Sequence, residues 1–341
     1  MVFVTGATGF LGSYVAEALL ACGQAVKLLA RRPEHARLLT GKGAQCVAGD
    51  LSSTAALAAA IKGCRFVIHC AALASDWGSW QDFREANDYG IGRLLKACEG
   101  VSLDRFVHIS TTDVYGYPDR DGLDETTPFC DRGLPYNSTK ISGELRLWAA
   151  IDAGLPATVI RPGSIYGPRS VTLGTDIVDY LRSGAPLVRS GRVNAGFVYV
   201  ENCVDLILLA MTHPAAAGVA FHSVDEDGQT WRDYFIALCR ALNLRMPRWS
   251  VPRPVAYMVG ALSEIYGRAM GYTSRPLVTR TAAEILGTRQ GFTMARARER
   301  LNFSPGIGFE EGVSRTAAWL LARIAMDDSC APSTRALCRH R

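Results

Sequence analysis

The sequence predicts an α/β protein that has a doubly wound parallel sheet and a smaller, mainly helical C-terminal lobe. Short and almost continuously apolar runs alternate with helical patterns over the first two thirds of the 341 residues. Such runs are typical of parallel strands that are covered on both faces. The alternation stops after Gly167, and from about Thr230 onward the pattern is mainly helical. The lobe is therefore expected to close over the carboxyl ends of the strands.

The strands and helices of the predicted sheet follow one another in regular order. "MVFVTG" predicts the first strand, and "GSYVAEALLACG" predicts a helix that ends at Gly23. The later strands are predicted in the apolar runs at 25–31, 44–50, 65–72, 105–111 and 157–163. Helical patterns separate several of them, at 52–64, 87–100 and 136–154. Repeated strand–helix–strand units imply right-handed crossovers within one parallel sheet.

The predicted chain leaves the sheet after Gly167 and then returns to it. "GRVNAGFVYVENCVDLILLAM" predicts one strand and one helix that return to the core, and "GVAFHSV" adds a short strand. The sheet domain is therefore expected to comprise residues 1–167 and about 196–228. The lobe, which would bind substrate, is expected at about 168–195 and 229–322. Residues 323–341 have little periodicity and are expected to form a mobile tail.

Composition and charge restrict the classes of function. Apolar residues make up 48% of the chain and charged residues 20%, as in ordinary globular proteins. The net charge is +5, but the dispersed lysines and arginines argue against a nucleic-acid partner. Ten cysteines occur without a CxxC pair or a His/Cys cluster, so we expect reduced thiols, no metal site and a cytoplasmic location. Neither a signal peptide nor a membrane-spanning helix is expected.

A glycine-rich turn follows the first predicted strand. Gly6, Gly9 and Gly12 are three residues apart, between an apolar run and an amphipathic one. Such a turn points unpaired N–H groups and the positive end of a helix dipole outward, which suits a phosphate. The spacing is G-x-x-G-x-x-G rather than G-x-G-x-x-G, and a tight turn that binds nothing is the alternative. Its position at the first strand of a doubly wound sheet favours a Rossmann-type dinucleotide site.

Two arginines follow the second predicted strand and bear on the choice of dinucleotide. An acidic residue at this place would bind the ribose 2′-hydroxyl of NAD, but here Ala30 is followed by Arg31 and Arg32. Two guanidinium groups suit the 2′-phosphate of NADP. NADP(H) is therefore the favoured cofactor, and NAD(H) is the second candidate. The alternative is that Arg31 and Arg32 belong to a solvated loop and bind no cofactor.

A tyrosine, a lysine and a threonine form the candidate catalytic group. Tyr136 and Lys140 are four residues apart in a predicted helix, so both project from one face. A tyrosine with a pKa of about 10 carries protons poorly at pH 7, and a nearby ammonium is expected to lower that pKa. Thr111 ends a predicted strand and offers a hydroxyl to a substrate oxygen. Because Tyr and Lys at this spacing are common on surfaces, the hydroxyl-rich strand end and the dinucleotide turn decide in favour of catalysis.

These motifs together resemble the extended short-chain dehydrogenases/reductases over about residues 1–320. The resemblance rests on "TGATGFLG", "GDL", "CAA", "HISTTDVYG", Tyr136-x-x-x-Lys140, "RPGSIYGP" and "FVYVENCVDLILLA". It implies that Thr111 polarises a carbonyl, that Tyr136 is the acid or base, and that Lys140 holds the nicotinamide ribose and tunes Tyr136. Threonine instead of the more frequent serine keeps the same chemistry. Besides the three glycines, the two arginines, Tyr136 and Lys140, the implied cofactor contacts are Thr8, Phe10, Leu11, Asp50, Leu51, Ala71, Ala72, Asn87, Pro162, Gly163 and Ile165.

The stretch "ALASDWGSWQDFREAN" and the C-terminal "ARARERLNFSPGIGFEEGVSRTAAWL" resemble one branch of this superfamily. The branch includes 3β-hydroxysteroid dehydrogenase-like proteins, reductases of 2-alkyl-3-ketoacids and dihydroflavonol-type reductases. It implies a hydrophobic small-molecule substrate with a ketone or secondary alcohol. Trp77 and Trp80 fall where the substrate entrance would lie, and Thr112 and Tyr166 are further candidate substrate contacts. Packing under a loop is the alternative for the two tryptophans.

The sequence is also compatible with two other functions and with two kinds of partner. A nucleotide-sugar epimerase or dehydratase with tightly bound NAD is the rival enzyme, and a non-catalytic NAD(P)-binding regulator is the rival of another class. The resemblance implies a homodimer. The segment "VPRPVAYMVGALSEIYGRAMGY" is amphipathic, and a core-facing helix is favoured over peripheral contact with a membrane.

Overall fold

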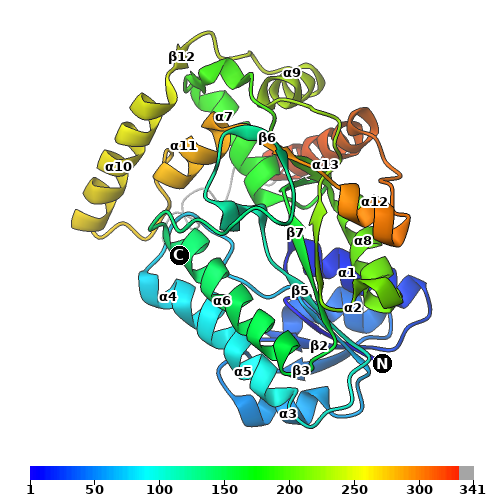
Figure 1. The fold of residues 1–341 in the computed structure, drawn as a ribbon. Helices are drawn as coiled ribbons and strands as arrows, with labels where there is room; N and C mark the ends of the chain where they lie inside the picture. The colour runs from blue at the N-terminus through cyan, green and yellow to red at the C-terminus, as the bar shows by residue number, and fades with distance from the viewer. Residues whose placement is uncertain (330–341) are drawn as a thin grey trace.

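A seven-stranded parallel sheet forms the centre of the computed structural model, which describes residues 1–329 (Figure 1). The strands lie in the order β11-β7-β5-β4-β1-β2-β3. Their bounds are β1 (Val2–Thr5), β2 (Val26–Ala30), β3 (Gln45–Ala48), β4 (Phe66–His69), β5 (Arg105–Ile109), β7 (Ala157–Pro162) and β11 (Val219–Ser223). Central Val4 pairs in register with Leu28 on one side and Ile68 on the other. The doubly wound α/β fold predicted from the sequence is confirmed.

Helices cover both faces of this sheet and produce two buried apolar layers. On one face, α1 (Phe10–Ala21) packs against α8 (Val200–Thr212). On the other face, α5 (Gly90–Ala97) packs against both α3 (Thr54–Ile61) and α6 (Pro135–Asp152). Both faces of the strands are therefore apolar, as the continuous apolar runs predicted.

The helix after β4 begins earlier in the chain than its sequence pattern indicated. The pattern predicted residues 87–100, whereas the structure continues from α4 (Trp80–Arg84) through a π-helical turn, Glu85–Tyr89, into α5. Ser79 caps the start of α4, because its hydroxyl accepts a hydrogen bond from the Asp82 N–H at 3.1 Å. A short helix, α2 (Arg37–Gly41), follows the turn Pro33–Ala36 after β2.

The lobe is mainly helical, and short strand pairs lie outside the central sheet. Its helices are α7 (Asp176–Ser183), α9 (Trp231–Ala241), α10 (Arg253–Ala269), α11 (Arg280–Gly287), α12 (Ala295–Leu301) and α13 (Phe309–Ser329). The strand pairs are β8 (Ser164–Tyr166) with β10 (Phe197–Tyr199), β9 (Leu187–Val188) with β12 (Ser250–Val251), and β6 (Arg120–Leu123) with β13 (Gln290–Phe292). Of these pairs, β6 with β13 joins the lobe to the sheet domain. Turns at Thr112–Tyr115, Val171–Thr175, Arg189–Gly191 and Pro214–Ala216 complete the connections. No helix within residues 1–329 is long and apolar enough to cross a bilayer.

Three expectations differ from this arrangement. The strand predicted within residues 191–211 does not return to the central sheet, because β10 pairs only with β8. The predicted tail is wrong for residues 323–329, which continue α13, while 330–341 lie outside the described residues. The favoured core-facing packing of α10 is also wrong, because its large apolar side chains are exposed.

Candidate active site

The glycine turn after β1 is a close-packed cradle. Gly6 adopts a φ of +72°, and a Cβ on it would lie 2.6 Å from the Ala71 backbone nitrogen. A Cβ on Gly12 would lie 2.2 Å from the Gly6 carbonyl oxygen. Gly9 is the N-cap of α1 and offers no side chain to its first N–H groups. The turn therefore excludes side chains where a pyrophosphate would need to approach the backbone, and it fits a bound dinucleotide.

The end of β2 presents both predicted arginines to solvent. Arg31 and Arg32 are exposed immediately after Ala30, and neither forms an ion pair with an acid of the described residues. The pKa of Asp50 is lowered, first by hydrogen bonds from Ser52 and also by the charge of Arg31. Arg31 and Asp50 therefore lie at the same edge of the sheet. The side chain of Leu51, the next residue, packs against Gly90 at the start of α5, where a Cβ would lie 3.0 Å from Leu51 Cδ1.

The end of β4 is tied to the glycine turn. The Thr5 hydroxyl pairs with His69 Nδ1 at 2.7 Å and accepts a hydrogen bond from the Ala71 N–H at 3.3 Å. Ala72 is exposed after it. Asn87 accepts from the Leu73 N–H at 2.8 Å and donates to the Leu73 carbonyl at 3.2 Å. The Asn87 amide is thus engaged by the protein itself, so its role in this structure is to hold the loop that follows β4.

Thr111, Tyr136 and Lys140 lie together at the carboxyl end of β5. Thr111 is buried and its hydroxyl accepts a hydrogen bond from the Asp113 N–H at 3.2 Å. The Tyr136 and Thr111 side chains are hydrogen-bonded to each other. Lys140 is one helical turn further along α6, and its Nζ donates to the Ile109 carbonyl oxygen at 2.8 Å. The predicted trio is therefore assembled on one strand end and one helix.

The electrostatics of this trio differ from the sequence expectation. Burial raises the pKa of Tyr136, and the Asp113 carboxylate raises it further, while the hydrogen bond with Thr111 lowers it. Burial lowers the pKa of Lys140 to about 8, against the influence of Glu144. The expectation that Lys140 lowers the pKa of Tyr136 is wrong here, because the ammonium is directed to the Ile109 carbonyl. Tyr136 is consequently a protonated phenol at neutral pH.

Asp113 and Tyr117 are neighbours of the trio that the sequence reasoning missed. The Tyr117 hydroxyl donates to Asp113 Oδ2 at 3.0 Å. Burial raises the pKa of Asp113 to about 6. Asn137 fixes this turn by donating to the Asp113 carbonyl oxygen at 2.7 Å. The only sequence signal was the position of Asp113 within "HISTTDVYG", two residues after the candidate hydroxyl.

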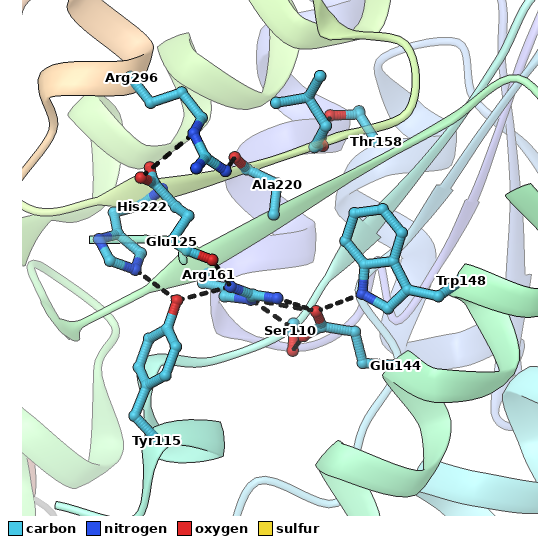
Figure 2. A network of polar contacts seen from close by, with 11 residues as sticks. Ser110, Tyr115, Glu125, Glu144, Trp148, Thr158, Arg161, Ala220, His222 and Arg296 are labelled. Carbon is cyan, nitrogen blue, oxygen red and sulfur yellow. Dashed lines mark hydrogen bonds and ion pairs between the residues drawn. The ribbon is translucent and has the colours of Figure 1, made fainter. Parts of the chain in front are cut away.

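A buried polar network connects α6, β7 and the end of β5 next to the trio (Figure 2). Figure 2 shows Arg161 of β7 between Glu144 of α6 and Tyr115, with Ser110, which follows β5, also directed at Glu144. The Arg161 Nε donates to Glu144 Oε1 at 3.1 Å, and its Nη1 donates to the Tyr115 hydroxyl at 2.6 Å. Because Ser110 adjoins Thr111 and Glu144 lies one turn after Lys140, this network fixes β5 and α6 relative to each other.

The segment after β7 begins with a close-packed turn at Gly163 and ends at a buried residue, Tyr166. A Cβ on Gly163 would lie 2.1 Å from the Gly196 carbonyl oxygen, so the backbone is closely packed beside Pro162. Ile165 is partly buried in β8. Tyr166 is fully buried, with its ring edge-on to Phe197 and Tyr199. The prediction of Tyr166 as a substrate contact is therefore wrong, because it belongs to the core of the lobe.

An open cavity of about 630 Å³ lies beside α10 and α11. It is lined by Asp119, Arg132, Arg189, Pro252, Arg253, Pro254, Tyr257 and Glu284. The Arg132 N–H donates to Asn137 Oδ1 at 2.7 Å, which connects the cavity wall to the helix that carries Tyr136. None of the predicted substrate residues Trp77, Trp80 and Thr112 lines this cavity. The cavity-lining arginines carried no motif by which sequence reasoning could have found them.

The predicted tryptophans lie on the loop and helix after β4. Trp77 packs against α10, where a Cβ on Gly267 would lie 3.1 Å from the indole, and the Arg268 guanidinium stands 5.6 Å from its ring centroid. Trp80 is partly exposed, with Arg84 over its ring at 5.7 Å. Thr112 is buried. Trp77 therefore joins the sheet domain to the lobe, while Trp80 faces solvent.

Metal ligands and disulfides do not feature in the described part of the chain. Among residues 1–329, no group of three or more His, Cys, Asp or Glu side chains could hold a metal ion. The eight cysteines in that range carry free thiols. The site thus offers hydroxyl, phenol and ammonium groups beside a dinucleotide cradle.

Comparison with known proteins adds a family and two relatives. The sequence model of the NAD dependent epimerase/dehydratase family matches residues 2–222. The chain is similar to a 2-alkyl-3-oxoalkanoate reductase of Stenotrophomonas maltophilia, with 29% identity over 326 residues, which cover 93% of this chain and 98% of that protein. It is also similar to the sterol-4-alpha-carboxylate 3-dehydrogenase, decarboxylating, of Mus musculus, with 26% identity over 329 residues, 92% of this chain and 89% of that protein.

A solved structure matches the fold over almost the whole chain. UDP-glucuronic acid 4-epimerase from Bacillus cereus in complex with NAD has a TM-score of 0.75 and covers 94% of this chain and 99% of its own. Its sequence identity to this chain is 20%, so the likeness shows the fold alone.

Proposed function

This chain belongs to the NAD dependent epimerase/dehydratase family, and we propose that it is an NADP-preferring oxidoreductase that acts on a ketone or secondary alcohol of a hydrophobic small molecule. The observation that carries the proposal is the grouping of Thr111, Tyr136 and Lys140 at the end of β5. A dinucleotide-binding regulator would have no need of a phenol, a hydroxyl and a buried ammonium at this edge of the sheet.

The trio can perform the proton transfer of a carbonyl reduction. The Thr111 hydroxyl, which is hydrogen-bonded to Tyr136, can donate to a substrate carbonyl oxygen placed beside both. Tyr136, which burial keeps protonated, can supply the proton that this oxygen needs as it becomes a hydroxyl. A bound nicotinamide would supply the hydride to the carbonyl carbon. The protonated phenol is the form that carbonyl reduction requires of its proton donor.

The dinucleotide would be held by the cradle and by the ends of β2 and β4. Gly6, Gly9 and Gly12 would accept the pyrophosphate on the N-terminus of α1. Arg31 and Arg32 would bind the 2′-phosphate of NADP(H). NAD(H) lacks that phosphate and would leave both guanidinium groups in water.

The cavity beside α10 supports a substrate with an acidic group. Arg132, Arg189 and Arg253 are ion-paired with the two acids of its lining, Glu284 and Asp119, and exceed them by one positive charge. This single excess charge suits a carboxylate, and a β-keto acid carries one two bonds from its ketone. The printed name of the bacterial relative says that it acts on 2-alkyl-3-oxoalkanoates. We accordingly favour long-chain β-keto acids within the wider class of hydrophobic ketones.

Replacing Tyr136 with phenylalanine tests the proton donor. We expect Tyr136→Phe to reduce ketone reduction about 10²- to 10⁴-fold, the usual contribution of one general acid, while the dissociation constant of NADPH changes little. NADPH oxidation and quenching of protein fluorescence measure the two effects. Tyr89→Phe, at an exposed tyrosine of the π-helical turn, is the matched control and should retain full turnover. Equal turnover by Tyr136→Phe and the control contradicts the assignment.

Replacing the two arginines tests the choice of cofactor. Arg31→Ala combined with Arg32→Ala should raise the KM for NADPH at least about tenfold and leave the KM for NADH unchanged, since both contacts to the 2′-phosphate are lost. Arg65→Ala, at an exposed arginine elsewhere in the sheet domain, controls for net charge. A substrate panel of β-keto acids, steroids, flavonoids and sugar nucleotides accompanies the assay. Conversion of a UDP-sugar without net oxidation of the cofactor would favour the epimerase instead.

A further inference from the structure

The outer face of α10 is an apolar surface on the outside of the lobe. We define the α10 face by Val255, Met258, Val259, Leu262, Ile265 and Tyr266, which are all exposed. Their spacing follows the helical repeat, so they form one stripe along the helix. Leu262 is 60% exposed and Ile265 is 66% exposed. Figure 1 shows α10 at the margin of the molecule, with α11 beside it.

The amphipathicity of α10 is the reverse of that expected for a core-facing helix. Its buried positions are Ala256, Gly260, Glu264 and Gly267. A Cβ on Gly260 would lie 2.5 Å from the backbone at Thr279, so α10 packs very closely on the segment before α11. Glu264 is buried because it binds Arg280, with Oε2 accepting from Nε at 2.9 Å. The small residues face the protein and the large apolar ones face away, which marks a contact surface.

The unpaired charges around the α10 face are arginines. Residues 240–283 contain seven arginines and one glutamate, with no lysine or aspartate. Arg253, Arg275 and Arg280 are ion-paired with Glu284, Asp76 and Glu264, which leaves four arginines, among them Arg240, without an ion pair within residues 1–329. The single glutamate is the buried Glu264. Arg245 and Arg248 precede α10 and Arg268 is near its end; all three are exposed and none is ion-paired within residues 1–329.

Aromatic residues stand beside these arginines. Trp249, just before α10, is 79% exposed, and Tyr272, just after it, is also exposed. Tryptophan and tyrosine are enriched at membrane–water interfaces, where the ring is buried and the polar edge is wet. The α10 face thus combines an apolar stripe, flanking aromatics and flanking arginines.

We propose that the α10 face docks on an anionic lipid surface, with Val255 to Tyr266 in the headgroup region and the flanking arginines on lipid phosphates. A second copy of this chain is the other candidate occupant. Two copies meeting through this face would bring the unpaired arginines of both copies, Arg245, Arg248 and Arg268, close together, whereas an anionic bilayer complements them.

Docking would also place the substrate cavity beside the lipid. Pro252, Arg253, Pro254 and Tyr257 line the cavity and belong to the start of α10. A hydrophobic ketone dissolved in the bilayer would then need to travel only a short way to the site. This route rests on the proposed function, but docking does not, because binding to vesicles needs neither cofactor nor turnover.

Sedimentation with lipid vesicles tests the proposal on the full chain. We expect the protein to bind vesicles of phosphatidylcholine with phosphatidylglycerol and to bind pure phosphatidylcholine vesicles at least about tenfold more weakly. Leu262→Ser with Ile265→Ser should weaken binding to the anionic vesicles at least about tenfold, because two half-exposed apolar side chains no longer insert. Arg245→Gln with Arg248→Gln should weaken it about tenfold.

Matched controls keep the outcome decisive. Leu38→Ser with Leu321→Ser changes two leucines that are 78% and 47% exposed on other helices, and it should bind vesicles like the native protein. Tyr136→Phe should also bind normally, so that a failed proposed function and a failed docking are distinguishable. Thermal unfolding checks that each variant is folded. The proposal is overturned if the native protein does not bind anionic vesicles or if both serine pairs weaken binding equally. Self-association that only the α10 pair abolishes, without vesicle binding, would assign the face to a second copy.

Discussion

Asp113 places a carboxylate beside two tyrosines at the end of β5. The Tyr117 hydroxyl donates to it at 3.0 Å, and its charge contributes to the raised pKa of Tyr136. Burial raises the pKa of Asp113 from 3.8 to about 6. A negative charge at this position opposes formation of the phenolate, so Asp113 helps to keep Tyr136 in its proton-donating form.

Asp113→Asn should separate the effects of this charge on stability and on catalysis. The folded-state pKa lies above the unfolded value, so the folded protein favours the proton, and the stability that this gives is lost as the pH rises from about 4 through about 6. The variant should therefore equal the native protein in stability below pH 4 and exceed it by about 2–3 kcal/mol above pH 7. Thermal or urea unfolding across this range measures the difference.

A second readout of the same variant is the pH profile of ketone reduction. Without the Asp113 charge, the pKa of Tyr136 is lower, so activity should decline at a lower pH than in the native enzyme. Asp152→Asn, at the exposed end of α6, is the control and should leave both profiles unchanged. Identical unfolding curves for the native protein and Asp113→Asn at pH 8 would contradict the buried-charge argument.

The sequence predicted which residues form the catalytic trio better than it predicted their hydrogen-bond partners and pKa shifts. Helical spacing was enough to place Tyr136 and Lys140 on one face of α6. It could not reveal that Lys140 is directed to the Ile109 carbonyl, because that oxygen belongs to a strand about thirty residues earlier. Glu144 and Arg161 were missed for the same reason, since their pairing depends on how α6 packs on β7.

The element that positions the dinucleotide is the turn between β1 and α1. Its glycines serve packing as much as conformation: only Gly6 has a positive φ, whereas Gly12 is helical and is required because α1 lies directly on the turn. Both features follow from the position of the helix N-terminus, which must approach the backbone of the first strand for its N–H groups to face a phosphate.

Gly12→Ala should therefore disable the cradle even though alanine has the higher helix propensity. The new methyl group would lie 2.2 Å from the Gly6 carbonyl oxygen, and either α1 or the turn must move. We expect the affinity for NADPH to fall at least about tenfold and stability to fall by about 1–3 kcal/mol, as in other overpacked positions. Gly41→Ala, at the end of α2 with open space around it, should change neither quantity. Titration calorimetry and urea unfolding compare the two, and an unaffected NADPH affinity in Gly12→Ala contradicts the assigned cradle.

Helix periodicity predicted where elements lie but not which side they turn inward. The pattern of residues 251–272 indicated an amphipathic helix, and α10 is one. Its small residues, rather than its large apolar ones, contact the protein, because the Gly260 position must approach the backbone before α11. The sequence gives no sign of this inversion, since an apolar stripe normally predicts a buried face.

At the scale of the whole molecule, the lobe is held by contacts between segments far apart in the chain. The pattern of "FVYV" predicted a sheet strand, but β10 pairs with β8 to form a separate bridge outside the central sheet. Such pairings depend on which strand edges remain free after the sheet is assembled, and local sequence does not encode this. The order of the central strands, by contrast, follows from regular crossovers.

The clearest of these long-range contacts is made by Asp76, in the loop after β4. Its carboxylate accepts hydrogen bonds from Arg275 Nη2 at 2.7 Å and from the Thr279 hydroxyl at 2.6 Å. Thr279 also caps α11, since its Oγ1 accepts from the Ala282 N–H at 3.1 Å. Together with the packing of Trp77 on Gly267, this contact fixes the loop to the segment between α10 and α11.

Asp76→Ala should loosen the lobe without unfolding the sheet domain. Because the pair is partly solvated, we expect the free energy of unfolding to fall by about 1 kcal/mol or less. The cavity, however, is built from α10 and α11 on one side and the sheet domain on the other, so its walls should separate more readily. The KM for substrate should then rise several-fold, while the KM for NADPH is unchanged because the cradle lies at the other end of the loop. Asp104→Ala removes an ion pair with Arg65 that lies wholly within the sheet domain, and it should leave both constants unchanged. Steady-state kinetics of the native protein, Asp76→Ala and Asp104→Ala measure both KM values. If Asp76→Ala raises the KM for substrate and the KM for NADPH together, or raises neither, the loop does not position the lobe over the substrate.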